Sequence, residues 1–474
     1  MNLSAHFDLN PLLNPQSVAI IGASQDTNKL VGRPLLYLMQ HKYKGKIYPV
    51  NPKYKEISGL PCYSSLANIP GEIDAVIIGL PAEGVLEAVR ECAARRVKSV
   101  IIFASGFAEI GEKGAELQEE LKKLALEAKM ALCGPNCQGI VNLHQGATLS
   151  FTPALERKQL RAGKIAFVTQ SGAMGGSLFS NAMQQGIGFS YWISSGNEAV
   201  LESADYINYL VQDEQTKVIL SYSEGFRDEK KFMAAAQAAR EAGKPLIVLR
   251  VGRTPMGKRA ARAHTGTEGI SDGKTEELFD RLGIIRVEDG DELLEMGNVL
   301  AQGRRPKGKK VGILSTSGGA GALIADQCEL VGLEVPEIMG LTKEEYLRLL
   351  PYFGSALNPI DVTAMFSQAM SKDPDYFKKL LYPLIRDEII DNIIIMITMA
   401  TGERAVKMAK DIVEVYQQTD KPIVVSWIAG NLAEDAYQVL REAGIPLFMN
   451  TKKSVQAIHT LVSYMEMIKK IGDK

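Results

Sequence analysis

The chain of 474 residues is long enough for about three domains. Its formal net charge of -1 excludes the basic excess that is typical of nucleic-acid-binding proteins, so no nucleic-acid partner is expected. Its five cysteines are odd in number and scattered, and they predict neither a disulfide framework nor a zinc site. Apolar stretches of signal-peptide or membrane-span length are absent, so we expect a soluble, cytoplasmic protein that does not bind membranes.

Short apolar strands alternate with helical stretches over residues 1–150. The segment 17–24 is a strand that ends in a glycine turn, and further strands are expected at 46–51, 75–80 and 99–103. This alternation predicts a parallel, doubly wound sheet with ligands at the carboxyl ends of its strands. The Gly-x-Gly-x-x-Gly sequence is absent from the first turn, so an NAD-dependent oxidoreductase is weakly supported. The residues at these strand ends are Ser24, Asn51, Pro52, Lys53, Pro81 and Ser105 to Phe107.

Two further segments begin alike, each with a strand, a turn of small residues and a helix. They start at Lys164 and Lys310 and align without a gap, so that Ser171 matches Ser317. Such an internal repeat predicts two domains of one fold. Linker-like stretches precede both segments, and we place the two domains at residues 160–303 and 307–474.

His264 distinguishes the two copies of this repeat. The interval from Pro245 to Gly283 is longer than its counterpart from Pro422 to Gly444, which contains no histidine, and the extra residues fall around His264. An insertion in one copy of a duplicated fold is more often functional than structural. Imidazole can act as a nucleophile near neutral pH, and nearby basic residues would neutralise phosphoryl charge. We therefore predict a functional histidine in a glycine-flanked loop, preceded by Lys258, Arg259 and Arg262.

Two further residues lie where site residues belong in this fold. Ser171, followed by Gly172, lies where a strand meets a helix, which favours either an anion site or an ordinary N-cap. Ser317 offers the same geometry without a nearby histidine, so a cap is expected there. Glu224 ends a strand and could orient a histidine, or could be a solvent-facing charge. Asn197 and Asp205 are expected to be loop and cap residues.

Six motifs follow one another along the chain, at residues 18–24, 45–53, 105–109, 134–137, 169–172 and 263–266. Taken in this order, they resemble the α subunit of NDP-forming acyl-CoA synthetases, the ADP-forming acetyl-CoA synthetase group related to succinyl-CoA synthetase. The resemblance covers essentially the whole chain. It implies an α/β fold with an N-terminal Rossmann-like CoA-binding domain, followed by two flavodoxin-like, doubly wound domains.

The resemblance also implies roles for individual residues. His264 falls on the phosphorylated histidine of the family, and Glu224 falls on the acidic residue that orients it. No metal ligand is implied on this chain. The implied CoA-binding residues are Ser24, Gln25, Lys53, Ser105 and Gly106, and the implied phosphate- or acyl-binding residues are Asn136, Cys137, Ser171 and Gly172.

The implied reaction interconverts acyl-CoA, ADP and phosphate with acid, CoA and ATP, through acyl phosphate and phosphohistidine. The chain lacks an ATP-grasp segment, so the resemblance implies a separate ATP-grasp β subunit that binds ADP or ATP with Mg²⁺, in an α2β2 heterotetramer. One departure lies at residues 315–321, which read Ser-Thr-Ser-Gly-Gly-Ala-Gly where the family commonly has Asn-Ala-Gly-Gly-Pro-Gly. The alternative hypothesis is a CoA-binding regulatory protein of the same fold without catalysis.

Overall fold

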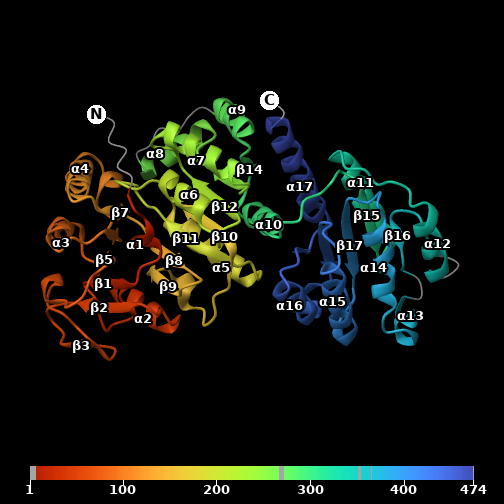
Figure 1. Cartoon of the computed structure of the whole chain (residues 1–474), viewed down its shortest axis with the longest axis horizontal. Coiled ribbons are helices and arrows are strands. Elements are labelled where there is room, and N and C mark those ends of the chain that lie inside the picture. The colour runs from red at the N-terminus through yellow and green to blue at the C-terminus, as the bar shows by residue number, and fades with distance from the viewer. Residues whose placement is uncertain (1–6, 266–271, 351–353, 364–365, 473–474) are drawn as a thin grey trace. The chain divides into compact units, whose positions relative to one another are not determined.

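The computed structural model describes residues 7–265, 272–350, 354–363 and 366–472 (Figure 1). The chain divides into two compact units, residues 1–297 and 298–474. None of the described helices is both long enough and apolar enough to cross a membrane.

The first sheet of unit 1 is parallel throughout and has the strand order β2-β1-β5-β6-β7. Its central strands are short apolar runs that are buried along their whole length, as expected for a sheet with helices on both faces. This order is that of a flavodoxin-like fold, with the reversal between β1 and β5. The strands are β1 (Ser17–Ile21), β2 (Lys46–Val50), β5 (Ala75–Ile78), β6 (Ser99–Ile102) and β7 (Ala131–Cys133), with a small hairpin of β3 (Glu56–Ile57) and β4 (Leu60–Pro61) beside them.

The second sheet has the order β14-β13-β12-β10-β11-β8-β9. Its parallel part repeats the order of the first sheet, and the antiparallel hairpin β8–β9 extends it beyond β11. This hairpin lies within residues 1–150, which the sequence had placed in the first domain, but it pairs with the second sheet. The strands are β8 (Gly139–Asn142), β9 (Ala147–Ser150), β10 (Ala162–Thr169), β11 (Phe189–Ser194), β12 (Val218–Ser223), β13 (Leu246–Arg250) and β14 (Ile285–Val287).

The sheet of unit 2 has the order β16-β15-β17-β18-β19, again parallel and again with the reversal beside its first strand. The helix after β15 is α11 (Gly318–Leu330), and the helix after β10 in unit 1 is α5 (Gly172–Gln184). Both helices have 13 residues. The repeat seen in the sequence is therefore a repeat of structure, and the predicted α/β fold class is confirmed. The strands are β15 (Val311–Ser315), β16 (Ile360–Asp361), β17 (Asn392–Thr398), β18 (Ile423–Ile428) and β19 (Leu447–Phe448).

Helices connect the strands of each sheet (Figure 1). The other helices of unit 1 are α1 (Asn10–Leu13), α2 (Arg33–Gln40), α3 (Ala82–Ala94), α4 (Glu112–Glu127), α6 (Ser203–Gln212), α7 (Glu229–Glu241), α8 (Pro255–Thr265) and α9 (Asp272–Leu282). The helix α10 (Gly290–Ala301) crosses the division between the units. The other helices of unit 2 are α12 (Gly340–Leu349), α13 (Phe366–Lys372), α14 (Tyr376–Arg386), α15 (Gly402–Tyr416), α16 (Glu434–Glu442) and α17 (Thr451–Gly472).

Close packing fixes α5 against the second sheet. The indole Nε1 of Trp192 donates to the carbonyl oxygen of Gly175 at 3.1 Å. A Cβ atom at Gly175 would lie only 2.3 Å from Cγ2 of Thr169 on β10. Because Thr169 is fully buried and cannot move aside, only glycine allows this approach. The contact sets the place of the α5 N-terminus.

Replacement of Gly175 by alanine is expected to destabilise the chain by about 2 kcal/mol, because the added methyl overpacks the α5–β10 contact. The matched control is Gly319→Ala in the first turn of α11, where an added Cβ would meet nothing within 4 Å. That change is expected to be neutral or slightly stabilising, because alanine favours helix. Urea unfolding of the two variants checks the contrast, and equal midpoints would contradict it.

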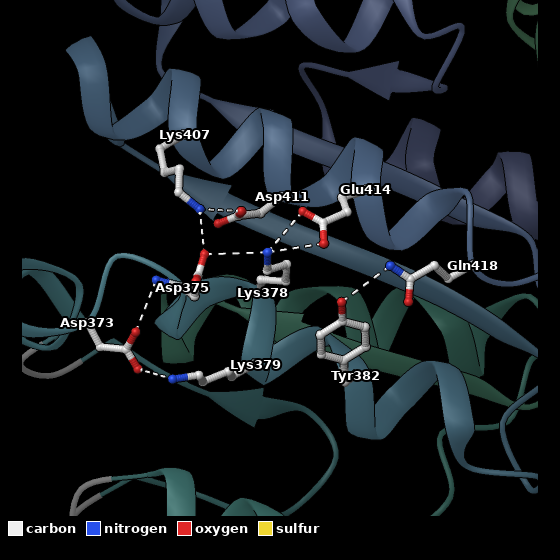
Figure 2. A network of polar contacts seen from close by, with 9 residues as sticks. All are labelled: Asp373, Asp375, Lys378, Lys379, Tyr382, Lys407, Asp411, Glu414 and Gln418. Carbon is white, nitrogen blue, oxygen red and sulfur yellow. Dashed lines mark hydrogen bonds and ion pairs between the residues drawn. The ribbon is translucent and has the colours of Figure 1, made fainter.

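Charged side chains join α14 to α15 in unit 2 (Figure 2). Lys378 donates to Glu414 at 2.9 Å, and Lys407 donates to Asp375 at 3.1 Å. Lys407 also donates to Oδ1 of Asp411 at 2.5 Å. The Asp411 side chain is only 2% exposed, and within the described residues its Oδ2 has no hydrogen-bond partner. The network therefore includes one carboxylate that is nearly removed from water.

Candidate functional site

The candidate site lies at the carboxyl end of the second sheet, where the strand order reverses. The neighbouring strands β10 and β12 pair in parallel, with Thr169 opposite Tyr222. Ser171 lies two residues beyond this pair on one strand, and Glu224 lies two residues beyond it on the other. In doubly wound sheets, ligands bind at such a switch point, because the adjacent connections leave toward opposite faces.

Ser171 occupies the N-cap position of α5, but its side chain makes no capping hydrogen bond. The equivalent Ser317 does cap its helix, accepting from the amide of Ala320 at 3.4 Å. The expectation of an ordinary cap at Ser317 is therefore confirmed, and the two serines differ. Since the first amides of a helix have no intrahelical acceptor and carry its positive dipole end, the start of α5 has the chemistry of an anion site.

The turn after β12 is held by Gln170, the residue before Ser171. The side-chain oxygen of Gln170 accepts from the backbone amides of Glu224 at 2.6 Å and Gly225 at 3.2 Å. Its side-chain nitrogen donates to the carbonyl oxygen of Gly225 at 2.8 Å. Glu224 itself is only 7% exposed. The hydrogen bonds of Gln170 therefore join the segment of Ser171 to the segment of Glu224. Gln170 lies inside the motif at residues 169–172, but its sequence context alone predicted no role for it.

The backbone of His264 lies in the last turn of α8, whereas the sequence predicted a loop. Thr254 starts this helix by accepting the amide of Gly257 at 3.0 Å, and Pro255 occupies its first position. A threonine followed by proline is a sequence signal for the start of a helix, and it is present here at residues 254–255. The side chain of His264 and residues 266–271, which continue the predicted motif, lie outside the described residues.

The implied CoA-binding residues follow strands of the first sheet. The hydroxyl of Ser24, after β1, accepts the amide of Asp26 at 3.1 Å, and the side chain of Gln25 donates to the carbonyl of Glu56 at 3.2 Å. Lys53, after β2, has an exposed side chain. Ser105 and Gly106 follow β6, and β5 separates this strand from β1. The residues after β1 and β2 and the residues after β6 therefore all lie at the carboxyl ends of the strands of this sheet.

The loop after β6 is held by Glu109. Its Oε1 accepts the amides of Gly106 at 2.6 Å and Phe107 at 3.2 Å. Its Oε2 accepts from Nδ2 of Asn197 in the second domain. Burial alone would raise the pKa of Glu109, but the hydrogen bonds from Asn197 and from these amides hold the pKa below its ordinary value. The carboxylate therefore keeps its charge and its role as an acceptor.

Asn136 and Cys137 lie in the turn between β7 and β8. Asn136 donates from its side chain to Oδ1 of Asn197 at 3.2 Å. Cys137 is 2% exposed, and its thiol donates to the carbonyl of Ile102 at 3.3 Å. Burial raises the pKa of this thiol well above its ordinary value. The Cys137 side chain is therefore part of the packing beneath the turn, and it has neither the exposure nor the ionisation of a nucleophile.

Comparisons with known proteins agree with this domain order. Family models match a CoA binding domain at residues 16–142, a succinyl-CoA ligase like flavodoxin domain at 162–300 and a Ligase-CoA domain at 311–467. The α subunit of ADP-forming acetate–CoA ligase II from Pyrococcus furiosus is 33% identical over 458 residues, which are 96% of this chain and 97% of that protein. The three domains and this relative place the chain among ligases with succinyl-CoA ligase-like domains.

A longer relative and a solved structure point to the same family. ADP-forming acetate–CoA ligase I from Archaeoglobus fulgidus is 33% identical over 456 residues, which are only 64% of that longer protein. Acetyl-coenzyme A synthetase 1 from Candidatus Korarchaeum cryptofilum, solved with phosphate and ADP, matches with a TM-score of 0.89 at 28% identity, covering 98% of both chains. The chain belongs to the family of ADP-forming acetate–CoA ligases and corresponds to their α subunits. The resemblance seen in the sequence motifs is confirmed.

Proposed function

We propose that this chain is the α subunit of an NDP-forming acyl-CoA synthetase and carries the phosphoryl group on His264. The observation that carries the proposal is the switch point of the second sheet, where the uncapped start of α5 and the buried Glu224 are held together by Gln170. Family membership supports the reaction class, and the resemblance of the sequence motifs supports the roles of these residues.

The proposed chemistry has three steps. An oxygen of phosphate attacks the carbonyl carbon of acyl-CoA, the C–S bond breaks, and CoA leaves with the electron pair of sulfur. A ring nitrogen of His264 then attacks the phosphorus of the acyl phosphate, the P–O bond breaks, and the carboxylate leaves. In the last step an oxygen of the nucleoside diphosphate attacks phosphohistidine, and the N–P bond breaks. The reverse sequence makes acyl-CoA.

Each residue group has one role in this proposal. The amides at Ser171 and Gly172 hold the phosphoryl oxygens, and the Glu224 carboxylate stabilises the imidazolium that forms at His264. CoA lies at the carboxyl ends of the strands of the first sheet, where the residues Ser24, Gln25, Lys53, Ser105 and Gly106 are found. In the turn that follows β7, Asn136 faces the acyl group, and Cys137 contributes backbone alone.

The nucleotide belongs to a partner in this proposal. A separate ATP-grasp β subunit binds ADP or ATP, and two copies of each chain form an α2β2 assembly. In line with the resemblance of the sequence motifs, Mg²⁺, which shields charge between phosphates, accompanies the nucleotide on the β subunit in this proposal.

Intact mass of the purified chain, after incubation with acetyl phosphate or with an acyl-CoA and phosphate, tests the proposal. We expect an acid-labile gain of about 80 Da, one phosphoryl group. Several acyl groups are offered, from acetyl to larger branched and aromatic ones. No gain with any of them, in a chain that is shown to bind CoA, would contradict the proposal and would favour the regulatory alternative.

A further inference from the structure

A tight turn after β11 contacts both domains of unit 1. Gly196, Asn197 and Glu198 form it, with backbone φ angles of 62° at Gly196 and 55° at Glu198. A Cβ at Gly196 would lie 2.4 Å from the carbonyl oxygen of Pro135, so the turn packs directly on the segment between β7 and β8. The amide of Asn197 donates to the same oxygen at 2.9 Å. This turn is therefore fixed against the first domain by its backbone.

Glu198 is 4% exposed, and both oxygens of its carboxylate accept hydrogen bonds. Its Oε1 accepts from the hydroxyl of Ser195 at 2.8 Å and from the amide of Ser203 at 3.0 Å. Its Oε2 accepts from Nε2 of Gln170 at 3.1 Å. Burial raises the pKa of Glu198, and the hydrogen bonds from Ser203, Ser195 and Gln170 act against this rise. A buried carboxylate with such partners is a rigid anchor.

This anchor fixes which way the amide of Gln170 points. A carboxylate only accepts hydrogen bonds, so Nε2 of Gln170 must face Glu198, and Oε1 must face the amides of Glu224 and Gly225. If the amide were reversed, Oε1 of Gln170 would face the Glu198 carboxylate, so that two acceptors would meet. Its Nε2 would face the backbone amides of Glu224 and Gly225, so that donors would meet donors. Glu198 therefore sets, through Gln170, the backbone position of Glu224.

Asn197 makes the corresponding link to the first domain. Its Nδ2 donates to Oε2 of Glu109 at 2.5 Å and to Oε1 of Gln118 at 3.0 Å. Glu109 in turn holds the amides of Gly106 and Phe107. Asn197 therefore supports the loop on which the proposed function places CoA.

We propose that Asn197 and Glu198 are positioning residues, which hold the CoA loop through Glu109 and the phosphoryl-transfer turn through Gln170. The inference rests on the proposed function for what the two loops bind. Neither side chain touches a reacting atom in this proposal. Because the two residues are adjacent in one fixed turn, the thiol-binding and phosphoryl-binding parts of the site keep a constant separation within unit 1.

Two nearly isosteric changes separate the two links. Glu198→Gln keeps the acceptor for Ser203 but presents a donor to the Gln170 amide, so the Glu224 turn loses its support. We expect the rate of phosphorylation by acetyl phosphate to fall about tenfold, with unchanged Kd for CoA. Asn197→Asp presents an acceptor to Glu109, so the Gly106 loop is released. We expect the Kd for CoA to rise about tenfold, with unchanged phosphorylation.

Controls keep this test decisive. Glu214→Gln removes one exposed charge from the same unit and should change neither quantity. Hydrogen–deuterium exchange should increase at residues 224–225 in Glu198→Gln and at residues 106–107 in Asn197→Asp. If the buried Glu198→Gln change prevents folding, Gln170→Met at a half-buried side chain removes the bond to Glu198 together with the bonds to Glu224 and Gly225. It is expected to show at least the same tenfold loss and the same faster exchange at 224–225.

The outcomes distinguish this inference from the proposed function. A wild-type chain that is phosphorylated, with variants that show unchanged rates and affinities, overturns the inference alone. Equal losses of both quantities in both variants also overturn it, because they indicate general destabilisation. A wild-type chain that takes no phosphoryl group overturns the proposed function, and with it the role of Glu198.

Discussion

Replacing His264 by asparagine is expected to abolish phosphorylation of the chain and to reduce turnover with the β subunit by at least about a thousandfold. Asparagine fits the end of a helix and keeps a hydrogen-bonding side chain, but its amide nitrogen has no lone pair that can attack phosphorus. The change therefore removes the nucleophile and leaves the backbone of α8 compatible with the new residue. Intact mass after incubation with acetyl phosphate measures the first effect directly.

The matched control is His144→Asn in the same unit. His144 is exposed, and its Nε2 lies 2.9 Å from the carbonyl oxygen of Gly163. This variant should be phosphorylated as the wild type is. A phosphoryl group that persists on the His264→Asn chain would refute the assignment of the carrier, and peptide mapping would then locate the residue that accepts it.

The fold could be predicted well from sequence because its signals are local. Buried parallel strands appear as short apolar runs, and the repeat of Ser171 and Gly172 at Ser317 and Gly318 is an ungapped match. The β8–β9 hairpin is an element whose place in the fold such local signals did not predict. Its residues are the last of the segment that the sequence assigns to the first domain, but β8 pairs with β11 of the second sheet. The pattern of apolar residues does not indicate which sheet a strand joins.

The candidate site was only partly predictable. Strand ends located Ser171 and Glu224, since the carboxyl edge of a parallel sheet follows from the alternation of elements. The Thr254–Pro255 pair is a helix-start signal. It could have indicated that the segment leading to His264 is a helix and not a loop. By contrast, the roles of Gln170 and Glu198 depend on hydrogen bonds between segments that are distant in sequence, and composition and spacing do not record such bonds.

Removal of the Lys407 ammonium is expected to have the largest effect on stability among the charged residues of Figure 2. In Lys407→Met the stem keeps its length, but Asp411 loses the cation 2.5 Å from its Oδ1. A carboxylate that is 2% exposed then has no hydrogen-bonded cation, and the charge of Lys378 compensates it only in part. We expect the free energy of unfolding of unit 2 to fall by about 3 kcal/mol at neutral pH, measured by urea unfolding.

Lys379→Met is the control within the same network. Lys379 pairs with Asp373, and both side chains are partly exposed, so water screens this pair and its loss should cost less than about 1 kcal/mol. If both variants lose the same stability, burial of Asp411 does not decide the effect.

The dependence on pH identifies the cause. Burial raises the pKa of Asp411, while Lys407 and Lys378 lower it and Asp375 raises it further. Without Lys407 the pKa must rise more, so the folded state binds a proton more readily than the unfolded state does. As the pH falls through this raised pKa, Asp411 becomes neutral, and the stability lost in Lys407→Met should return. The additional change Asp411→Asn should restore it at neutral pH as well. A loss that stays constant with pH would instead indicate packing of the Lys407 stem, because only the charge on Asp411 responds to protons.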